Sequence, residues 1–245
     1  LAVWLEGAYQ AQTSNMTTVL NDFQLLPGQN PLFFIGQETA AGQPYDGIPW
    51  NYDGTEGDPY DYQLLNDDRA GYPPEVVDWV LVSLRSGIDE SSVFCRQAAW
   101  LTQSGTIVLP ASCDCTFTLG QEVYVVIEHR NHLPVMSPNP TEVTVDGVSF
   151  DFRNQQSYTT FTGDGQKLIG DGVYAMYATN GDQSSAIGAR SDINASDEAL
   201  WTFQNSIGDF YIIGDFNMDG DVNSNDEVYW LLNKAKSSDV PFDSQ

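Results

Sequence analysis

The stretch Asp78-Trp-Val-Leu-Val-Ser-Leu-Arg85 is the clearest structural element in this chain of 245 residues. Its apolar and β-branched residues favour an extended strand, and Gly, Pro and Asp residues interrupt the chain on both sides of it. Its apolar part, Trp79–Leu84, is far shorter than the roughly 20 residues that a membrane-spanning helix needs. We therefore expect a buried strand here and no segment that crosses a membrane.

Similar short runs continue along the chain as far as residue 179, separated by turn-forming residues. The expected strands are Leu1–Tyr9, Asp78–Arg85, Ser92–Leu101, Thr106–Leu109, Glu122–Arg130, Thr141–Val145, Val148–Phe152 and Gly172–Ala178. Asp146-Gly147 between Val145 and Val148 predicts a two-residue hairpin turn, because Asp-Gly tolerates positive φ. This pattern predicts a mainly β protein in which residues 1–179 form an antiparallel β-sandwich, as one domain or as two sub-domains.

The chain is strongly acidic, with 34 Asp and Glu against 9 Lys and Arg and a formal net charge of -25 at pH 7. Such a charge repels the phosphate backbone of nucleic acids and anionic membrane surfaces. Hydrophobic residues still make up 41% of the sequence, which is enough for a folded core. We therefore expect a folded acidic protein that has no nucleic acid partner.

The start of the chain and its three cysteines favour export. The sequence begins at Leu1 without an initiator Met, as expected after removal of a signal segment. In an oxidising compartment Cys95 can pair with either Cys113 or Cys115, which leaves one thiol unpaired in the monomer. The sequence thus predicts an extracellular or cell-surface protein with one disulfide, in which the partner of Cys95 is either Cys113 or Cys115.

Residues 180–245 have a different character and contain an internal repeat. Asp192, Asn194, Asp197, Glu198 and Trp201 recur as Asp221, Asn223, Asp226, Glu227 and Trp230, at a constant shift of 29 residues. Agreement at this many positions indicates a duplicated structural unit. Because two short helices cannot bury Trp201 and Trp230 by themselves, we expect them to lie on the chain's own sandwich or on a neighbouring molecule.

The second copy of the repeat has the spacing of an EF-hand-type loop. Asp215, Asn217, Asp219, Asp221, Asn223 and Asp226 occupy loop positions 1, 3, 5, 7, 9 and 12, with Gly220 at position 6. Alternate residues of such a loop can direct their oxygens to one Ca²⁺, which takes about six to eight oxygen ligands. The spacing predicts one calcium ion in this loop and a short helix after it.

The first copy retains only the second half of this pattern. Asp192, Asn194 and Asp197 are present, but the expected early ligands are missing at the same spacing. Either this loop is degenerate, or an insertion separates its first ligands, Asn180 and Asp182, from the others. A second calcium ion is expected only under the insertion hypothesis.

The extended segment Phe210–Ile213 before the loop, a helix after it, and Asp in place of Glu at position 12 together resemble a dockerin repeat. Residues 180–245 are therefore similar to a dockerin module. The chain as a whole resembles uncharacterised secreted or cell-surface β-sandwich proteins of Bacteroidota. It carries this resemblance in the stretches Val3–Tyr9, Asp78–Arg85 and Tyr124–Ser137. The resemblance implies a small α-helical module with EF-hand-type loops, calcium-dependent folding and display outside the cell, but no particular reaction.

No catalytic motif is evident. His129 and His132 are the only histidines, and on a single strand a three-residue separation places their side chains on opposite faces. With 34 acidic residues, a pair of carboxylates at the spacing of a glycosidase site is expected by chance and carries no information. We therefore expect a protein that is not an enzyme and has no catalytic residues.

Aromatic residues gather in a long excursion between residues 37 and 74. Trp50, Tyr52, Tyr60 and Tyr62 alternate there with acidic residues. The rings can stack on sugars, the acidic residues between them can bind another calcium ion, or the rings can pack on the sandwich beneath them and keep the loop ordered. These interpretations stay open at the level of sequence.

Together these patterns predict a secreted structural or adhesive protein, such as a surface-layer or filament subunit, that is stabilised by calcium. Its expected partners are other copies of itself or other surface proteins. The alternative is a carbohydrate-binding module of a secreted polysaccharide-binding system. Glycoside hydrolase is a third interpretation, kept because β-sandwiches host such enzymes and a fold does not determine function.

Overall fold

The computed structural model describes residues 1–29, 42–57, 71–110, 115–160, 164–183 and 189–242. Its strands are β1 (Tyr9–Gln10), β2 (Asn15–Met16), β3 (Val76–Arg85), β4 (Val93–Thr102), β5 (Ile107–Val108), β6 (Glu122–His129), β7 (His132–Met136), β8 (Thr141–Glu142), β9 (Lys167–Gly170) and β10 (Val173–Ala175). Its helices are α1 (Val19–Asp22), the 3-10 turn η1 (Glu90–Ser92), α2 (Ala195–Gln204) and α3 (Ser224–Asn233). The paired strands are antiparallel, which confirms the prediction of a mainly β protein.

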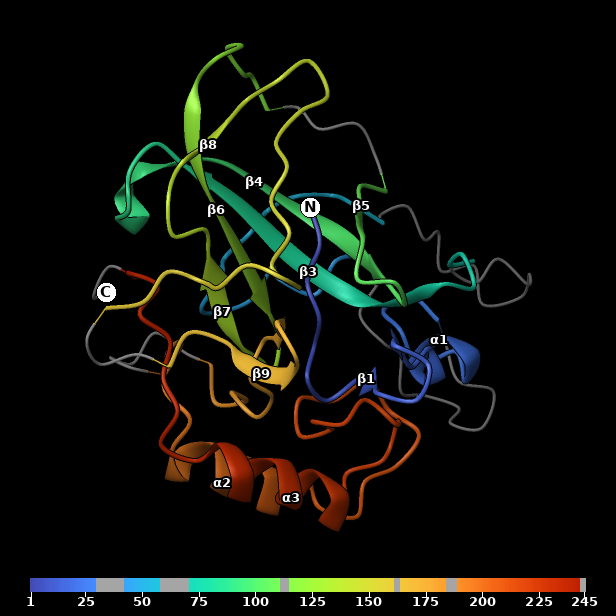
Figure 1. Cartoon of the computed structure of the whole chain (residues 1–245). Helices are drawn as coiled ribbons and strands as arrows, with labels where there is room; N and C mark the ends of the chain where they lie inside the picture. The colour runs from blue at the N-terminus through green and yellow to red at the C-terminus, as the bar shows by residue number, and fades with distance from the viewer. Residues whose placement is uncertain (30–41, 58–70, 111–114, 161–163, 184–188, 243–245) are drawn as a thin grey trace.

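The centre of the molecule is a sheet with the strand order β5-β4-β3-β6-β7, extended by β8 on β6 (Figure 1). Strand β3 pairs with β4 on one side and with β6 on the other, and all ten of its residues are buried. A strand covered on both faces has few polar residues, which explains the continuous apolar run at this position.

Different parts of the chain cover the two faces of the sheet. On one face, Val80, Val82 and Leu84 of β3 pack against residues that include Leu5 and Met176. On the other face, Trp79, Leu81 and Ala98 pack beneath Tyr45 and Trp50. Among the described residues, irregular chain and the two-stranded ribbons β1-β2 and β9-β10 take the place of the expected second large sheet.

The expected strands at Leu1–Tyr9 and Val148–Phe152 are mostly irregular segments in the structure. Their amides pair with several different neighbours: Ala2 donates to Phe150, and Val3 donates to Gly105. Since each segment changes partner along its length, isolated bridges replace a continuous ladder.

The Asp146-Gly147 turn is present, but Thr144 and Gly147 close it, with hydrogen bonds of 3.0 Å in both directions. The two turn residues are therefore Val145 and Asp146, and the closing pair lies one residue earlier in the chain than the predicted pair, Val145 and Val148. Gly147 has a φ of +90°, which accounts for a glycine at this position.

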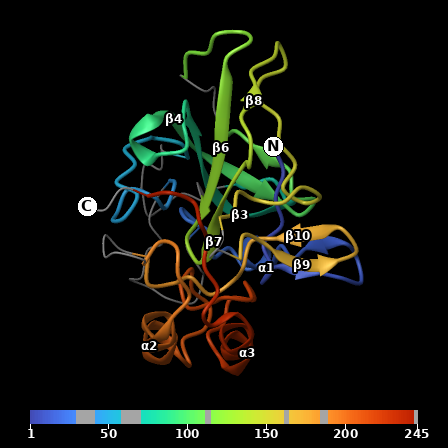
Figure 2. The same cartoon turned by 60° about the vertical axis from the view of Figure 1, so that its left-hand side comes forward.

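Helices α2 and α3 lie side by side at one end of the β domain (Figure 2). Trp230 of α3 packs with Leu133, Tyr177 and Ile193, so this indole is buried against the chain's own β domain. Beyond α3 the chain returns to the sheet, where Val240 joins Val126 and Met136. The expectation that the chain's own β domain supports the helices is therefore confirmed for Trp230 only. Trp201 packs instead with Phe216 and Val222 of the C-terminal unit itself.

The disulfide joins Cys95 of β4 to Cys115, one of the two partners that the sequence allows. Cys113 lies outside the described residues. The bond anchors the segment that follows β5 back onto the sheet, with a sequence separation of 20 residues.

We predict that Cys115→Ala lowers the free energy of unfolding by about 3 kcal/mol, because it releases the loop that this disulfide closes. Cys113→Ala is the matched control and should keep both the disulfide and the stability. Urea denaturation and mass spectrometry of non-reduced peptides measure the two effects. Equal destabilisation by both substitutions would contradict the pairing.

Candidate functional site

The acidic loop before α3 is closed by Asp226, which is fully buried. Its Oδ1 accepts hydrogen bonds from the amides of Phe216 (2.7 Å) and Asn217 (3.0 Å), at the start of the loop. Its Oδ2 accepts from the amide of Asn223 (2.8 Å), the N-cap residue of α3. One carboxylate therefore joins the start of the loop to its end and caps the helix.

A second buried carboxylate, Asp215, lies inside the same loop. Its two oxygens accept hydrogen bonds from the amides of Asp219 (3.1 Å) and Gly220 (3.0 Å). Gly220 has a φ of +90°, the left-handed conformation that position 6 of such a loop requires. The loop is thus tightly wound about oxygen-bearing side chains, as its spacing predicts.

These carboxyl groups are electrostatically unfavourable as anions. Burial, opposed by Arg130 and reinforced by Asp226 and Asp219, raises the pKa of Asp215 to about 7. Burial likewise raises the pKa of Asp226 to about 6, with a smaller contribution from Asp219. A bound cation would relieve this repulsion. In the described part of the chain, no three His, Cys, Asp or Glu side chains form a ready-made metal cluster.

The first copy of the repeat reproduces the closing carboxylate. Oδ1 of Asp197 accepts from the amides of Gly181 (2.7 Å) and Asp182 (3.0 Å), and Oδ2 accepts from Asn194 (2.7 Å), the N-cap of α2. Asn180 and Asp182 therefore correspond to Asp215 and Asn217 of the second copy. This correspondence fits the insertion hypothesis, because six more residues separate Asn180 from Asp197 than separate Asp215 from Asp226.

Two oxygens of the first loop are buried without a hydrogen-bond partner among the described residues. They are Oδ1 of Asn180 and Oδ1 of Asp182. Burial, together with neighbouring Asp197, raises the pKa of Asp182 to about 7. A buried oxygen without a donor costs free energy, so both atoms fit a site that receives a cation. Asp192, the other acid predicted there, has a pKa raised by burial alone.

The two copies also hold each other through their tryptophans. Nε1 of Trp201 donates to the carbonyl of Asn223, and Nε1 of Trp230 donates to the carbonyl of Asn194, each over 3.0 Å. Each indole of one repeat thus binds the N-cap residue of the helix in the other. The duplication seen in the sequence is therefore a structural duplication as well.

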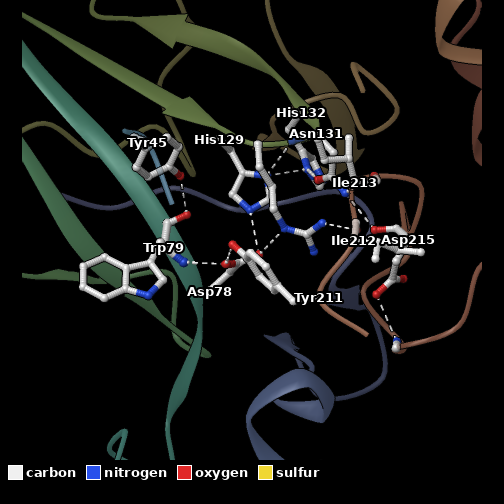
Figure 3. Close-up of polar contacts among 12 residues, drawn as sticks. Tyr45, Asp78, Trp79, His129, Asn131, His132, Tyr211, Ile212, Ile213 and Asp215 are labelled. Atoms are coloured by element: carbon white, nitrogen blue, oxygen red, sulfur yellow. Dashed lines mark hydrogen bonds and ion pairs between the residues drawn. The ribbon is translucent and has the colours of Figure 1, made fainter. Parts of the chain in front are cut away.

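A buried polar network attaches this unit to the sheet (Figure 3). Asp78 of β3 accepts hydrogen bonds from Nε2 of His129 (3.1 Å), Nε of Arg130 (3.0 Å) and the hydroxyl of Tyr211 (2.6 Å). Burial alone would raise the pKa of Asp78, but Arg130 and His129 outweigh burial and lower this pKa to about 2. Asp78 is therefore an anion that three side chains hold in place.

The turn between β6 and β7 binds the entrance of the second acidic loop. Arg130 donates through Nη1 to the carbonyl of Ile212, and Nδ2 of Asn131 donates to the carbonyls of Ile213 (3.0 Å) and Asp215 (2.7 Å). Figure 3 shows this turn between Asp78 and Asp215. The sheet thus fixes the first residue of the loop that the sequence predicts to bind calcium.

The prediction that His129 and His132 lie on opposite faces is wrong. Arg130 and Asn131 turn the chain between β6 and β7, which makes the two histidines cross-strand partners with their Nδ1 atoms 3.0 Å apart. No Gly, Pro or Asp marks this turn in the sequence. Burial lowers the pKa of both imidazoles, so they act as neutral members of the network.

The aromatic residues predicted to contact glycans have different environments. Trp50 is buried against the sheet and offers no exposed ring face, whereas Tyr52 lines a cavity of about 580 Å³ together with Glu56, Phe94 and Arg96. The predicted contacts Tyr60 and Tyr62 lie outside the described residues. Of the two positions that the structure describes, Tyr52 stays a candidate for ligand contact.

Comparison of the chain with protein-family models, with curated proteins and with solved structures finds no match. In the parts of the chain that the structure describes, every helix is too short or too polar to span a membrane. The functional argument therefore rests on the geometry of the acidic loops and of their attachment to the sheet.

We predict that Asp78→Asn lowers the free energy of unfolding by about 3–5 kcal/mol, because Arg130 stays buried and loses its anionic partner. The lowered pKa of Asp78 implies a contribution to stability that is present above about pH 4 and is lost as the pH falls towards 2. The free energy of unfolding of the variant should therefore change less with pH over this range. Urea denaturation between pH 2 and 7 measures both effects.

Asp146→Asn, in the exposed hairpin turn, is the control for this prediction. Its free energy of unfolding should change by less than about 0.5 kcal/mol. An Asp78→Asn protein as stable as this control would show that the network does not hold the two parts together.

Proposed function

We propose that the protein is a secreted, non-enzymatic structural or adhesive protein of the cell surface, with a dockerin-like C-terminal unit that binds calcium. The observation that carries the proposal is the pair of acidic loops, each closed by a buried carboxylate on the N-terminus of a helix. Buried acids with raised pKa values destabilise a fold unless a cation neutralises them.

The oxygen ligands of the second loop fit a hard divalent cation. Side-chain oxygens come from Asp215, Asn217, Asp219 and Asp226, and the carbonyl of Asp221 supplies a further ligand at position 7. In the first loop, Asn180, Asp182 and Asp197 supply the corresponding early and late ligands. Residues 215–226 of the second loop include no Lys or Arg, so calcium would supply the positive charge there.

Calcium in the second loop would also strengthen the attachment to the sheet. The carbonyl of Asp215 already accepts a hydrogen bond from Asn131, in the turn that carries Arg130. Ordering the loop therefore orders the contact with the β6–β7 hairpin, and binding to the folded form alone adds stability by mass action.

The outer face of the helices offers a surface for assembly. Phe203 of α2 and Leu232 of α3 occupy equivalent positions of the repeat, and their exposed fractions are 87% and 63%. Large apolar side chains at matched positions favour contact with another surface. A net charge of -25 keeps molecules apart, so calcium would promote this contact by reducing the repulsion.

Carbohydrate binding is the second candidate function, and the cavity beside Tyr52 favours it. The ring of Tyr52 and the half-exposed ring of Phe94 lie beside the charged residues Glu56 and Arg96. Oε2 of Glu56 is buried there without a hydrogen-bond partner in the described part of the chain. Aromatic walls with a few polar groups are typical of sites for small polar ligands such as sugars.

We predict that calorimetry detects two calcium ions for the native protein and one for Asp215→Asn, which loses the first ligand of the second loop. At free calcium near 100 times Kd, each site should stabilise the folded protein by about 2.7 kcal/mol. Asp146→Asn should bind calcium like the native protein. No heat of binding, with an unchanged melting curve in chelator, would contradict the calcium proposal.

We also predict that calcium promotes compaction or assembly, measured as hydrodynamic radius by light scattering over a range of protein concentration. Phe203→Ser with Leu232→Ser should suppress assembly, because it removes the exposed apolar contacts. Phe23→Ser changes an aromatic residue of 62% exposure outside this face and is the matched control. A monomer of constant radius in both conditions would contradict the structural role and favour sugar binding.

A further inference from the structure

Three side chains from distant parts of the chain meet where α3 ends. Nζ of Lys167 in β9 donates hydrogen bonds to Oε1 of Glu6 and, over 3.0 Å, to Oδ1 of Asn233, the last residue of α3. Nδ2 of Asn233 donates to Oε2 of Glu6 over 2.7 Å. An amine, a carboxamide and a carboxylate therefore form a closed triangle.

Two members of this triangle are buried, and the third, Lys167, is partly exposed. Asn233 is fully buried, Glu6 is 7% exposed, and 26% of the Lys167 side chain is accessible. The backbone of Ala178 fixes two of its members: its amide donates to Oε2 of Glu6 and its carbonyl accepts from Nδ2 of Asn233, each over 3.1 Å. The carboxamide thus cannot rotate away without losing both of its hydrogen-bond acceptors.

We propose that Lys167 and Asn233 become joined by an amide bond between their side chains, formed by the protein itself with Glu6 as the acid-base group. A lysine amine is a nucleophile once it loses its proton, and a neighbouring carboxylate can take that proton. Holding the amine against the amide raises its effective concentration by many orders of magnitude, to about 10⁵ M or more in well-oriented systems.

The reaction balances without an oxidant or any other reagent. Glu6 takes one proton from the Lys167 ammonium, and the freed Nζ electron pair forms a bond to Cγ of Asn233. Glu6 gives that proton to Nδ2, the bond between Cγ and Nδ2 breaks, and the second Nζ proton leaves with the departing nitrogen. One ammonium and one carboxamide thus become one secondary amide and one ammonium ion.

The position of Glu6 suits both proton transfers. One of its oxygens contacts the nucleophile Lys167, and the other contacts Nδ2 of Asn233, the leaving group. A single carboxyl can therefore accept a proton on one side and deliver one on the other. The low exposure of the site protects the tetrahedral intermediate from water.

The bond would connect β9 to the end of α3 across 66 positions of the chain. It would tie the C-terminal unit to the β domain covalently, at a place separate from both acidic loops. It thus goes beyond the calcium proposal and does not depend on it. A cross-link that closes a long segment restricts the unfolded chain, as a disulfide does.

Another lysine provides an internal comparison. Lys236 contacts Oδ1 of Asp164 over 2.6 Å, but the side chains are 36% and 26% exposed. Its partner is a carboxylate, a poor acceptor for an amine, and no third acid is part of this contact among the described interactions. We expect Lys236 to remain an ordinary ion-pair residue.

Mass spectrometry of the full-length protein tests the proposal, after denaturation and reduction of the Cys95–Cys115 disulfide. The expected mass is lower than the sequence mass by one ammonia molecule. Protease digestion should release a branched peptide that contains both Lys167 and Asn233. Fragmentation of that peptide should place the mass loss at the link between the two side chains.

Variants separate this bond from a cyclic imide of asparagine, which also loses ammonia. Lys167→Arg and Glu6→Gln should restore the full sequence mass, whereas Lys236→Arg should keep the deficit. A deficit that persists in Lys167→Arg would show an imide and would overturn the proposal. Peptide mapping of the native protein needs no variant, so a substitution that impairs folding does not weaken the test.

A folded native protein with the full sequence mass, and unlinked peptides for Lys167 and Asn233, would also overturn the proposal. Neither result bears on calcium, because calorimetry tests the acidic loops directly. Chelator-treated and calcium-loaded protein should show the same mass deficit once the bond has formed.

Discussion

The buried carboxylate of Asp78 is the constraint on which the arrangement of the two parts depends. Removal of this anion from water is costly, and the cost is offset only because His129, Arg130 and Tyr211 all donate to it. His129 ends β6 and Arg130 follows it, whereas Tyr211 belongs to the segment before the second acidic loop. The carboxylate therefore fixes the distance between the sheet and that loop, which apolar packing alone would leave adjustable.

The C-terminal unit is attached at more than this one place. At the end of α3, Asn233 binds Glu6 and Lys167, and beyond that helix Val240 packs on the sheet. Contacts of different chemistry thus cross the sequence boundary near residue 180. Calcium bound in the loops would therefore act on a unit that is already oriented, and would stiffen it.

The central strands could be predicted because burial leaves an apolar signal in β3, β4 and β6, which is strongest in β3, where all ten residues are buried. Strand β7 was not predicted, because the single turn-forming residue before it, Asn131, has no neighbouring Gly, Pro or Asp to mark a hairpin. The side chains of Arg130 and Asn131 instead hold distant carbonyls. The sequence left two hypotheses for the first loop, since no spacing rule accommodates an insertion of this length. The Glu6, Lys167 and Asn233 triangle has no sequence signal, because its members lie in three distant segments.

The scarcity of basic residues has a structural meaning. Among the described residues, the basic side chains in the ion pairs found are those of Arg130, Arg153, Lys167, Arg190 and Lys236. Four of these five bind an acid at least 50 positions away, so they act as links between distant segments. These basic side chains thus serve mainly as links within the fold, and with 9 Lys and Arg against 34 Asp and Glu the chain keeps a large excess of negative charge. A surface built this way needs cations from solution before two copies can approach, so the assembly that we propose depends on an environment rich in calcium.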